Sequence, residues 1–396
     1  MKIPLEVLSG ASLLGFFLTL NIIPNFRESF LKANLFGCDL NKRSGSKVPE
    51  AGGVLSGCVF LIITITCLPS ALGQYLVQKD AFPHEEFARL LAALLSISAM
   101  LLLGFVDDVL DLKWRHKLAL PSIASLPLLV VYYVVADRTD IVVPLMFRPL
   151  MGTYIDLGFL YYLYIGLLAV FCTNAINILS GINGLEVGQA VLIAASVGIF
   201  NLREINGPLG DYHRFSLYFI LPFISTSLAL LYYNWYPARV FCGDTFCYFS
   251  GMTLAVVAIL GHFSKTLLLF FVPQVLNFLL STPQLFKLLP CPRHRLPKYD
   301  PDSDTLSPSR VALPPQLSPL GALLLRVLSS LRLIRYDEKA REVSNLTLPN
   351  LCLLMTGPIF EVRLTLILLS FQVACSMIAF LIRYPLALLL YGEVVA

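Results

Sequence analysis

About ten apolar runs divide this chain, and they constrain its fold more than any other feature of the sequence. A helix needs about 20 consecutive, mostly apolar residues to cross a bilayer. Runs of that kind lie near 4–24, 52–72, 88–106, 118–136, 158–176, 187–203, 215–233, 246–261, 265–287 and 364–382. Only 14% of the residues are charged, whereas a soluble protein of this size has roughly a quarter. The sequence therefore predicts an all-α polytopic membrane protein with about ten transmembrane helices.

The distribution of basic residues predicts which side of the membrane each loop faces. With ten spans both termini share one side, and the loops after odd-numbered spans share the other. Those loops hold 20 of the 29 lysine and arginine residues. Without the long last loop nine remain on each side, but the odd-span loops are then the shorter set. Because short cytosolic loops are enriched in lysine and arginine, we expect the odd-span loops in the cytosol and both termini on the lumenal side.

One segment of appreciable size lies outside the apolar runs. We expect a single transmembrane catalytic domain over 1–396, with residues 288–363 inserted as a cytosolic loop between the ninth and tenth helices. Its proline-rich first part is expected to be irregular or extended. In the stretch 320–335, LGALLLRVLSSLRLIR, apolar residues recur at helical spacing with arginines between them. Such a helix lies at the membrane surface or packs on the rest of the loop, and the sequence leaves both open.

Four polar motifs each follow an odd-numbered span: DDVLD at 107–111, NAINILSGING at 174–184, FCGD at 241–244 and CPRHRLP at 291–297. Singly, each has an ordinary structural explanation, such as a helix cap, a membrane boundary or a lipid-headgroup contact. Polar loops placed at random would be divided between the two faces of the membrane. We therefore expect the four motifs to converge on one face.

The chemistry of these motifs suits a diphosphate bound with a metal ion. Carboxylate and amide oxygens are the ligands that Mg²⁺ prefers, glycine-rich turns expose backbone N–H groups to anions, and lysine and arginine neutralise phosphate. The residues concerned are Asp107, Asp108, Asp111, Asp244, Asn174, Asn177, Asn183, Gly181, Gly184, Gly188, Gly243, Lys117, Arg293 and Arg295.

Two function classes fit such a site: an enzyme acting on a membrane-embedded phosphate, and a transporter of an anionic or nucleotide-sugar solute. Transporter sites usually lie near the bilayer midplane on interrupted helices. Here the polar residues gather at the ends of the spans, which favours the enzyme. The sequence has no GxxxxGK[ST], HExxH or GxSxG motif, so P-loop ATPase, zincin and serine hydrolase chemistry is excluded.

The stretches DDVLD, NAINILSGINGL, FCGDTFCYFSG and CPRHRLP resemble the signature motifs of the polyprenyl-phosphate N-acetylhexosamine-1-phosphate transferases. The resemblance extends over nearly the whole chain. SGING and RHR are similar to the eukaryotic branch, whereas bacterial relatives have an aspartate-rich second motif and a histidine-rich last one. Asp111 stands where we expect asparagine in the animal enzymes, so its role is left open.

The resemblance implies a reaction and its setting. N-acetylglucosamine 1-phosphate would pass from UDP-N-acetylglucosamine (UDP-GlcNAc) to dolichyl phosphate, giving GlcNAc-diphosphodolichol and UMP, the first step of N-glycan precursor synthesis. It also implies Mg²⁺ as cofactor, inhibition by tunicamycin, a homodimer, and a multi-pass protein of the endoplasmic reticulum membrane whose site faces the cytosol. Its partners would be the two substrates and the lipid bilayer, and we expect no nucleic acid.

The resemblance also assigns roles to individual residues. Asp107, Asp108 and Lys117 would be catalytic, and Asn177 and Asp244 would hold the metal. The nucleotide sugar would be bound by Leu40, Glu50, Asn183, Phe241, Arg293, His294 and Arg295. The lipid phosphate would be bound by Lys117, Phe171, Asn174 and Ile178, and the lipid tail would lie in a groove between spans.

Overall fold

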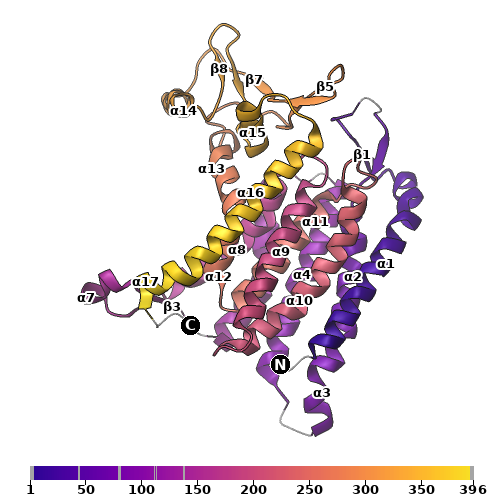
Figure 1. The fold of residues 1–396 in the computed structure, drawn as a ribbon, viewed down its shortest axis with the longest axis vertical. Coiled ribbons are helices and arrows are strands. Elements are labelled where there is room, and N and C mark those ends of the chain that lie inside the picture. Colours follow the sequence, from indigo (N-terminus) through magenta and orange to yellow (C-terminus); the bar gives the residue numbers. More distant parts are fainter. Residues whose placement is uncertain are drawn as a thin grey trace.

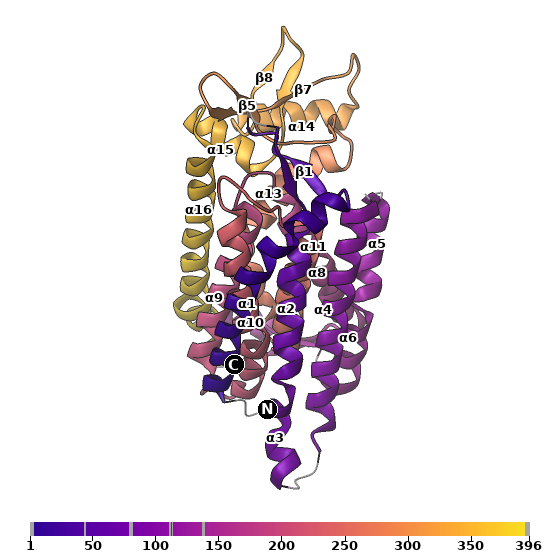
Figure 2. The same cartoon turned by 90° about the vertical axis from the view of Figure 1, so that its right-hand side faces the viewer.

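Long helices running side by side form the body of the protein, and a smaller module of short strands and helices lies at one end (Figures 1 and 2). The computed structural model describes residues 4–42, 45–78, 82–110, 112, 114–136 and 139–392. The bundle consists of α1 (Leu5–Lys32), α2 (Gly52–Thr66), α3 (Leu68–Gln78), α4 (His84–Leu110), α5 (Trp114–Ala124), α6 (Leu126–Val131), α8 (Phe159–Ile178), α9 (Leu185–Glu204), α10 (Gly210–Asn234), α11 (Gly243–Leu260), α12 (Ser264–Phe270), α13 (Val272–Leu285), α16 (Glu361–Leu381) and α17 (Ala387–Tyr391).

Eight helical segments of the described chain are long and apolar enough to cross a membrane. The predicted run 265–287 is instead split into α12 and α13, whose axes are bent by 72°. Pro273 lies in the first turn of α13, where its ring stops one continuous helix from passing through. The predicted run 118–136 contains α5 and α6, and its apolar helical part, Ala119–Val135, is shorter than the other spans. The all-α multi-pass class is confirmed, with eight spans, or nine if the bent pair counts as one, among the described residues.

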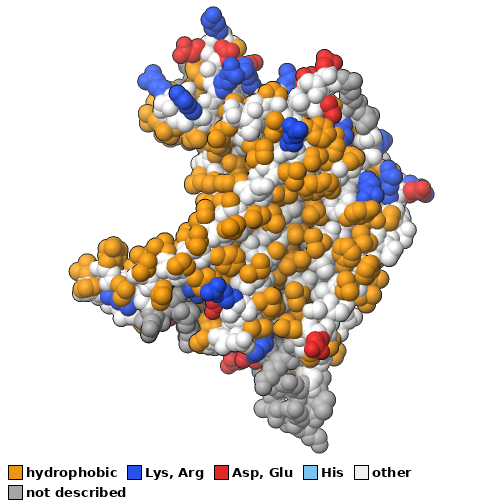
Figure 3. Space-filling view, in the orientation of Figure 1, with side chains coloured by type: hydrophobic (Ala, Val, Ile, Leu, Met, Phe, Trp, Pro, Cys, Tyr) orange, Lys and Arg blue, Asp and Glu red, His pale blue; other side chains and the backbone are white. Residues whose placement is uncertain are grey.

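On the face drawn in Figure 3, hydrophobic side chains form a broad belt across the middle of the bundle, and charged side chains gather towards its two ends. Large exposed leucines occur on several helices, among them Leu14 of α1, Leu95 of α4 and Leu163 of α8. A soluble protein rarely exposes an apolar surface of this extent. The belt is therefore the surface that faces lipid.

Helix α11 is the centre of the bundle, since 89% of its residues are buried. Glycines let two neighbouring helices approach it closely. A Cβ added to Gly104 of α4 would lie 2.5 Å from Cα of Thr245, and one added to Gly251 of α11 would lie 2.3 Å from the carbonyl oxygen of Cys172 in α8. Small residues at such crossings bring helix backbones together in membranes. As a result, the polar ends of α4 and α8 lie beside the first turn of α11.

The smaller module follows α13 and precedes α16 (Figure 1). It contains the antiparallel pair β5 (Lys298–Asp300) and β6 (Thr305–Ser307), and a three-stranded sheet in the order β7 (Arg310–Ala312), β9 (Glu342–Ser344), β8 (Tyr336–Asp337). Helices α14 (Pro319–Ser330) and α15 (Leu348–Thr356) complete it. The proline-rich part, predicted to be irregular or extended, thus forms short strands, and the predicted amphipathic helix is α14.

Two further hairpins mark the ends of the bundle. β1 (Phe36–Cys38) pairs with β2 (Lys47–Pro49) at the end that bears the module, and β3 (Asp140–Val142) pairs with β4 (Tyr154–Asp156), next to the short α7 (Arg148–Met151). Helix α1 begins and α17 ends away from the module (Figure 1). That this end faces the lumen stays a prediction.

Candidate functional site

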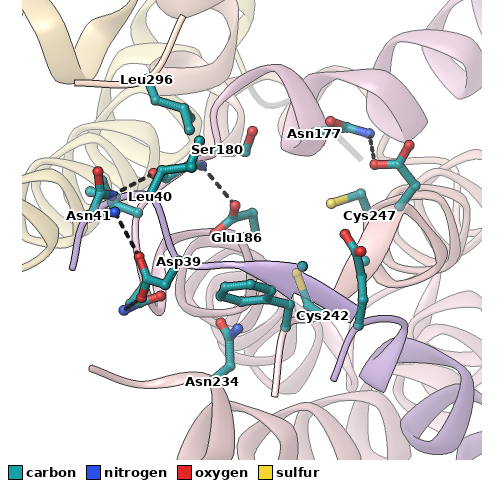
Figure 4. Close-up of a pocket in the computed structure, with 18 of the residues that line it drawn as sticks. Asp39, Leu40, Asn41, Asn177, Ser180, Glu186, Asn234, Cys242, Cys247 and Leu296 are labelled. Carbon is teal, nitrogen blue, oxygen red and sulfur yellow. Dashed lines mark hydrogen bonds between the residues drawn. The ribbon is translucent and has the colours of Figure 1, made fainter. Parts of the chain in front are cut away.

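A polar cavity of about 280 Å³ lies at the module end of the bundle. Figure 4 shows Asp39, Glu186, Asn177 and Cys247 around it, contributed by segments far apart in the chain. Seven of the residues predicted to bind metal or nucleotide sugar line this cavity: Leu40, Glu50, Asn177, Asn183, Phe241, Asp244 and His294. Residues of three of the four motifs line this cavity, and the fourth, DDVLD, joins them through the contact of Asp108 with the first turn of α11. The four motifs therefore lie together at one end of the bundle, as predicted, and the side of the membrane that this end faces stays a prediction.

The first turn of α11 is held in place by Asp108. Its carboxylate oxygens accept hydrogen bonds from the backbone N–H groups of Asp244 at 2.6 Å and Thr245 at 3.1 Å, and from the Thr245 hydroxyl. Gly243 precedes this turn with φ +73°, and a Cβ there would lie 2.4 Å from Oδ2 of Asp108. Asp108 is thus a helix cap supplied from a neighbouring helix, and it positions Asp244.

Asp244 receives two side-chain contacts at its carboxylate. Nδ2 of Asn177 donates to Oδ1 at 2.6 Å, and Nζ of Lys117 donates to Oδ2 at 2.8 Å. The same ammonium group lies 2.9 Å from Oδ2 of Asp107, which also accepts a hydrogen bond from the Tyr248 hydroxyl at 2.9 Å. Asp107 is 2% exposed, whereas the side chain of Asp244 keeps 27% of its surface accessible. The chain therefore joins its predicted catalytic and metal-binding residues in one network, with Asp244 at the edge of the cavity.

The loop between α8 and α9 forms the second wall. Gly181 and Gly184 have φ of +101° and +79°, conformations that residues with a Cβ rarely adopt. Asn183 is fixed at three atoms: its backbone N–H donates to Glu361 at 2.7 Å, its carbonyl accepts from the Thr365 hydroxyl at 3.1 Å, and its side-chain amide donates to Asp39 at 3.1 Å. The last long helix, α16, thus holds this loop.

The hairpin β1–β2 forms the third wall, next to the ring of Phe241. The backbone N–H of Phe241 donates to the carbonyl of Pro49 at 2.8 Å, and a Cβ at Gly37 would lie 3.1 Å from the ring. Glu50 follows the hairpin. Its burial, together with the negative charge of Asp244, raises the pKa of the Glu50 carboxyl above its usual value. This wall combines a flat apolar ring with a carboxyl group.

The RHR motif contributes one residue to the cavity lining, His294, whereas Arg293 and Arg295 do not line it. Leu296, just after the motif, lines the cavity as well, and Arg293 is exposed. Arg295 is partly buried, and its Nη1 has no hydrogen-bond partner among the described residues. Burial lowers the pKa of the Arg295 guanidinium. A buried cationic nitrogen without an acceptor is the kind of group that an anionic ligand would complete.

The residues predicted to bind the lipid phosphate on α8 do not line the polar cavity. Asn174 donates to the carbonyl of Val170 within its own helix at 2.9 Å, and the carbonyl of Ile178 accepts from Asn277 at 3.1 Å. Phe171 instead lines a second cavity, of about 380 Å³, between α8 and α12. Its other lining residues are apolar except for one tyrosine: Leu160, Leu163, Tyr164, Leu167, Leu168 and Leu268.

Several site residues were missed from the sequence. Asp39 and Glu186 line the cavity, Glu361 supports its loop, and Tyr248 contacts Asp107. Glu186 and Glu361 had a usable signal, because an acidic residue at the start of an apolar run suggests a function. Asp111, whose role the sequence left open, lies outside the described residues.

The donor set fits Mg²⁺ only if a ligand shares the coordination. Among the described residues, no group of three or more His, Cys, Asp and Glu side chains could hold a metal ion alone. Mg²⁺ is, however, commonly held by one or two carboxylates together with substrate phosphates and water. Asp244 and the amide oxygen of Asn177 supply such a partial set, with Asp107 and Glu50 adding negative charge nearby.

The chain is similar to proteins of a known family. The profile of glycosyl transferase family 4 matches residues 90–262. A UDP-N-acetylglucosamine–dolichyl-phosphate N-acetylglucosaminephosphotransferase of Saccharomyces cerevisiae is 42% identical, over 97% of this chain and 92% of its own. Proteins of the same name from Schizosaccharomyces pombe and Dictyostelium discoideum are 42% and 45% identical, over 97% and 93% of this chain and 93% and 86% of their own.

Proposed function

The chain belongs to the family of the UDP-N-acetylglucosamine–dolichyl-phosphate N-acetylglucosaminephosphotransferases, to three of which it is 42–45% identical over most of its length, and it matches the glycosyl transferase family 4 model. We propose that it transfers N-acetylglucosamine 1-phosphate from UDP-GlcNAc to dolichyl phosphate. An oxygen of the lipid phosphate attacks the β-phosphorus, the bond from that phosphorus to the bridging oxygen breaks, and UMP leaves. The product is GlcNAc-diphosphodolichol. The second pKa of a phosphate monoester is about 6, so the lipid phosphate is already ionised at neutral pH and needs little help from a base.

The meeting of Lys117, Asp244 and Asn177 at the cavity edge is the observation that carries this proposal. The lipid phosphate and the diphosphate of the nucleotide sugar are both anions and repel each other. Fixed positive charge in the site reduces this repulsion. An ammonium group has three donors, of which Lys117 directs two at Asp107 and Asp244. The third has no partner among the residues that the structure describes and would bind an oxygen of the lipid phosphate, so Lys117 lies where the nucleophile would be held.

Asp244 and Asn177 would hold Mg²⁺, with Asp107 adding negative charge next to them. When bound, the ion neutralises diphosphate oxygens and the charge that develops on the leaving group. Asn177 would turn its carbonyl oxygen towards the ion, because the amide nitrogen now donates to Asp244. Asp108 contributes indirectly, since its carboxylate is already occupied by the first turn of α11.

The remaining walls suit the nucleotide sugar. The ring of Phe241 would stack on uracil, and Leu40 and Glu50 also line the cavity. The side-chain Nδ2 of Asn183 donates to Asp39, so its side-chain Oδ1 is the atom left to accept from a uracil N–H. Arg293, His294 and Arg295 would bind the diphosphate and the sugar, with the unpartnered Nη1 of Arg295 among the donors.

The apolar cavity between α8 and α12 would receive the lipid tail. It is lined by Phe171 and by leucines of both helices, in the hydrophobic belt. Asn174 lies further along α8, between this cavity and Asn177, and Ile178 is the last residue of the helix. A chain lying along α8 would therefore direct its phosphate towards Asn177 and Lys117.

We also propose the membrane in which the reaction takes place, the side that the site faces and the oligomeric state. Basic residues concentrated on the side of the site favour a cytosolic location, in the membrane of the endoplasmic reticulum. The homodimer that the family resemblance implies is testable by light scattering of the purified protein. A single-copy mass in several detergents would contradict it.

The proposed function is tested with purified protein, sugar-labelled UDP-GlcNAc and dolichyl phosphate. We expect Mg²⁺-dependent transfer of label to the lipid extract, and loss of that transfer in Asp244→Ala. The exposed Glu338 of the module provides a matched acid, and Glu338→Gln should retain activity. Full activity of Asp244→Ala at saturating Mg²⁺ would contradict the metal assignment. Uptake of intact UDP-GlcNAc into proteoliposomes, without lipid product, would support the transporter instead.

A further inference from the structure

Helix α14 has an apolar face that nothing in the described chain covers. Leu320, Leu323, Val327 and Leu331 are 51%, 57%, 44% and 61% exposed. Their spacing of three or four residues places them along one side of the helix. Figure 2 shows that α14 runs across the bundle axis, so that it lies parallel to the plane in which a bilayer would lie.

The opposite face of α14 fixes its height above the bundle. Leu325 belongs to a buried apolar cluster of the module, and Leu280 of α13 packs against that cluster. A Cβ at Gly321 would lie 2.4 Å from the carbonyl oxygen of Leu288, just beyond the end of α13. The first turn of α14 therefore touches the chain just beyond the end of α13.

The surface next to the apolar face of α14 is apolar as well. Leu276, Leu279 and Phe286, on α13 and just after it, are 44%, 61% and 60% exposed, as expected for residues that face lipid. The view in Figure 3 shows hydrophobic side chains on the side of the module that faces the belt, and lysine and arginine side chains further out. Arg326 and Arg332 are exposed on and just after α14, and long basic side chains of this kind extend to phosphate groups while their stems cover apolar surface.

We propose that α14 lies in the surface of the bilayer leaflet that the active site faces. Leu320, Leu323, Val327 and Leu331 enter the boundary between headgroups and acyl chains, and Arg326 and Arg332 contact lipid phosphates. Interfacial helices with an apolar face and basic residues bind membranes in this way. The two possibilities that the sequence left open then both hold, because one face of α14 packs on the module and the other on lipid.

This contact does not depend on the proposed function, but it would serve it. The cluster beneath α14 includes Leu289, two residues before the CPRHRLP motif. Holding α14 on the leaflet therefore fixes the height of His294 and Arg295 relative to a phosphate that reaches the site from the same leaflet.

The test uses the full chain in phosphatidylcholine vesicles, with and without brominated lipid. The exposed Cys38, Cys58 and Cys291 are replaced by serine. One cysteine at a time is then introduced and labelled with a small fluorophore, as Leu323→Cys or Val327→Cys, as Leu279→Cys on the lipid-facing side of α13, and as Glu338→Cys on the exposed turn between β8 and β9.

We expect brominated lipid to quench the labels at Leu323 and Val327 as strongly as the label at Leu279, and to leave the label at Glu338 unchanged. The double variant Arg326→Gln, Arg332→Gln should weaken quenching at Leu323 but not at Leu279. Quenching at Leu279 without quenching at either α14 position would overturn the proposal. So would energy transfer between Leu323 labels of two copies in place of lipid quenching, because a second chain would then cover the face.

Discussion

Replacing Asp108 by asparagine separates a residue that positions Asp244 from one that takes part in the chemistry. The carboxylate now accepts three hydrogen bonds, from the N–H groups of Asp244 and Thr245 and from the Thr245 hydroxyl. Asparagine keeps the shape but offers one oxygen, and its NH₂ group would face a backbone donor. At least one donor at the start of α11 then loses its partner.

The size of the effect follows from these contacts. A buried donor left without an acceptor costs about 1–3 kcal/mol, and losing a negative charge at a helix N-terminus costs about 0.3–1 kcal/mol more. A total of about 1.3–4 kcal/mol that falls on the placement of Asp244 lowers kcat roughly 10- to 700-fold, since about 1.4 kcal/mol corresponds to a factor of ten. Because no substrate touches Asp108 in this account, KM for both substrates should change little.

The assay is steady-state transfer by Asp108→Asn, together with the thermal inactivation midpoint of the detergent-solubilised protein. We expect both kcat and the midpoint to fall. Thr245→Val, which removes one of the three bonds, should show a smaller loss of the same kind, and Thr245→Ser should behave like the wild type. A much larger loss of kcat with an unchanged midpoint would refute the reasoning, because it would mean that Asp108 acts on the reacting atoms. Unchanged activity would refute it as well.

Three further outcomes are expected. Leu163→Trp should fill part of the apolar cavity, raising KM for dolichyl phosphate but not for a short-chain lipid phosphate. Glu361→Ala should raise KM for UDP-GlcNAc more than it lowers kcat, because Glu361 holds the backbone of Asn183; Glu361→Gln, which keeps an acceptor, should restore KM. The raised pKa of Glu50 costs stability above that pKa, where the folded protein must ionise the group, and costs nothing below the usual value of 4.5. Glu50→Gln should therefore be more thermostable than the wild type at neutral pH, with a difference that disappears in acid.

Hydropathy located most of the spans because a membrane helix needs a long apolar run, and the parity of the polar motifs located the site. The bend between α12 and α13 was missed, although Pro273 marks it, because an apolar run looks the same whether the helix is straight or broken. The fourth run was predicted as a full span, but α5 and α6 divide it, and two of its residues, Pro121 and Pro127, are prolines.

The different roles of Asp107 and Asp108 could not be read from the sequence. Successive residues of a helix point about 100° apart, so one carboxylate meets Lys117 and Tyr248 and the other meets the backbone of α11. Which of them does so depends on where α11 lies. In the same way, Glu361 supports Asn183 from 178 residues away, and no local pattern reports such a contact.

Donor labelled at its β-phosphate tests the central claim most directly. The lipid phosphate is proposed to attack the β-phosphorus, so the label should enter the lipid product. UMP should be released in equal amount, and only in the presence of Mg²⁺. Release of UDP, with the label in the nucleotide, would mean that the sugar alone is transferred, and the proposed reaction at Asp244, Asn177 and Lys117 would be wrong.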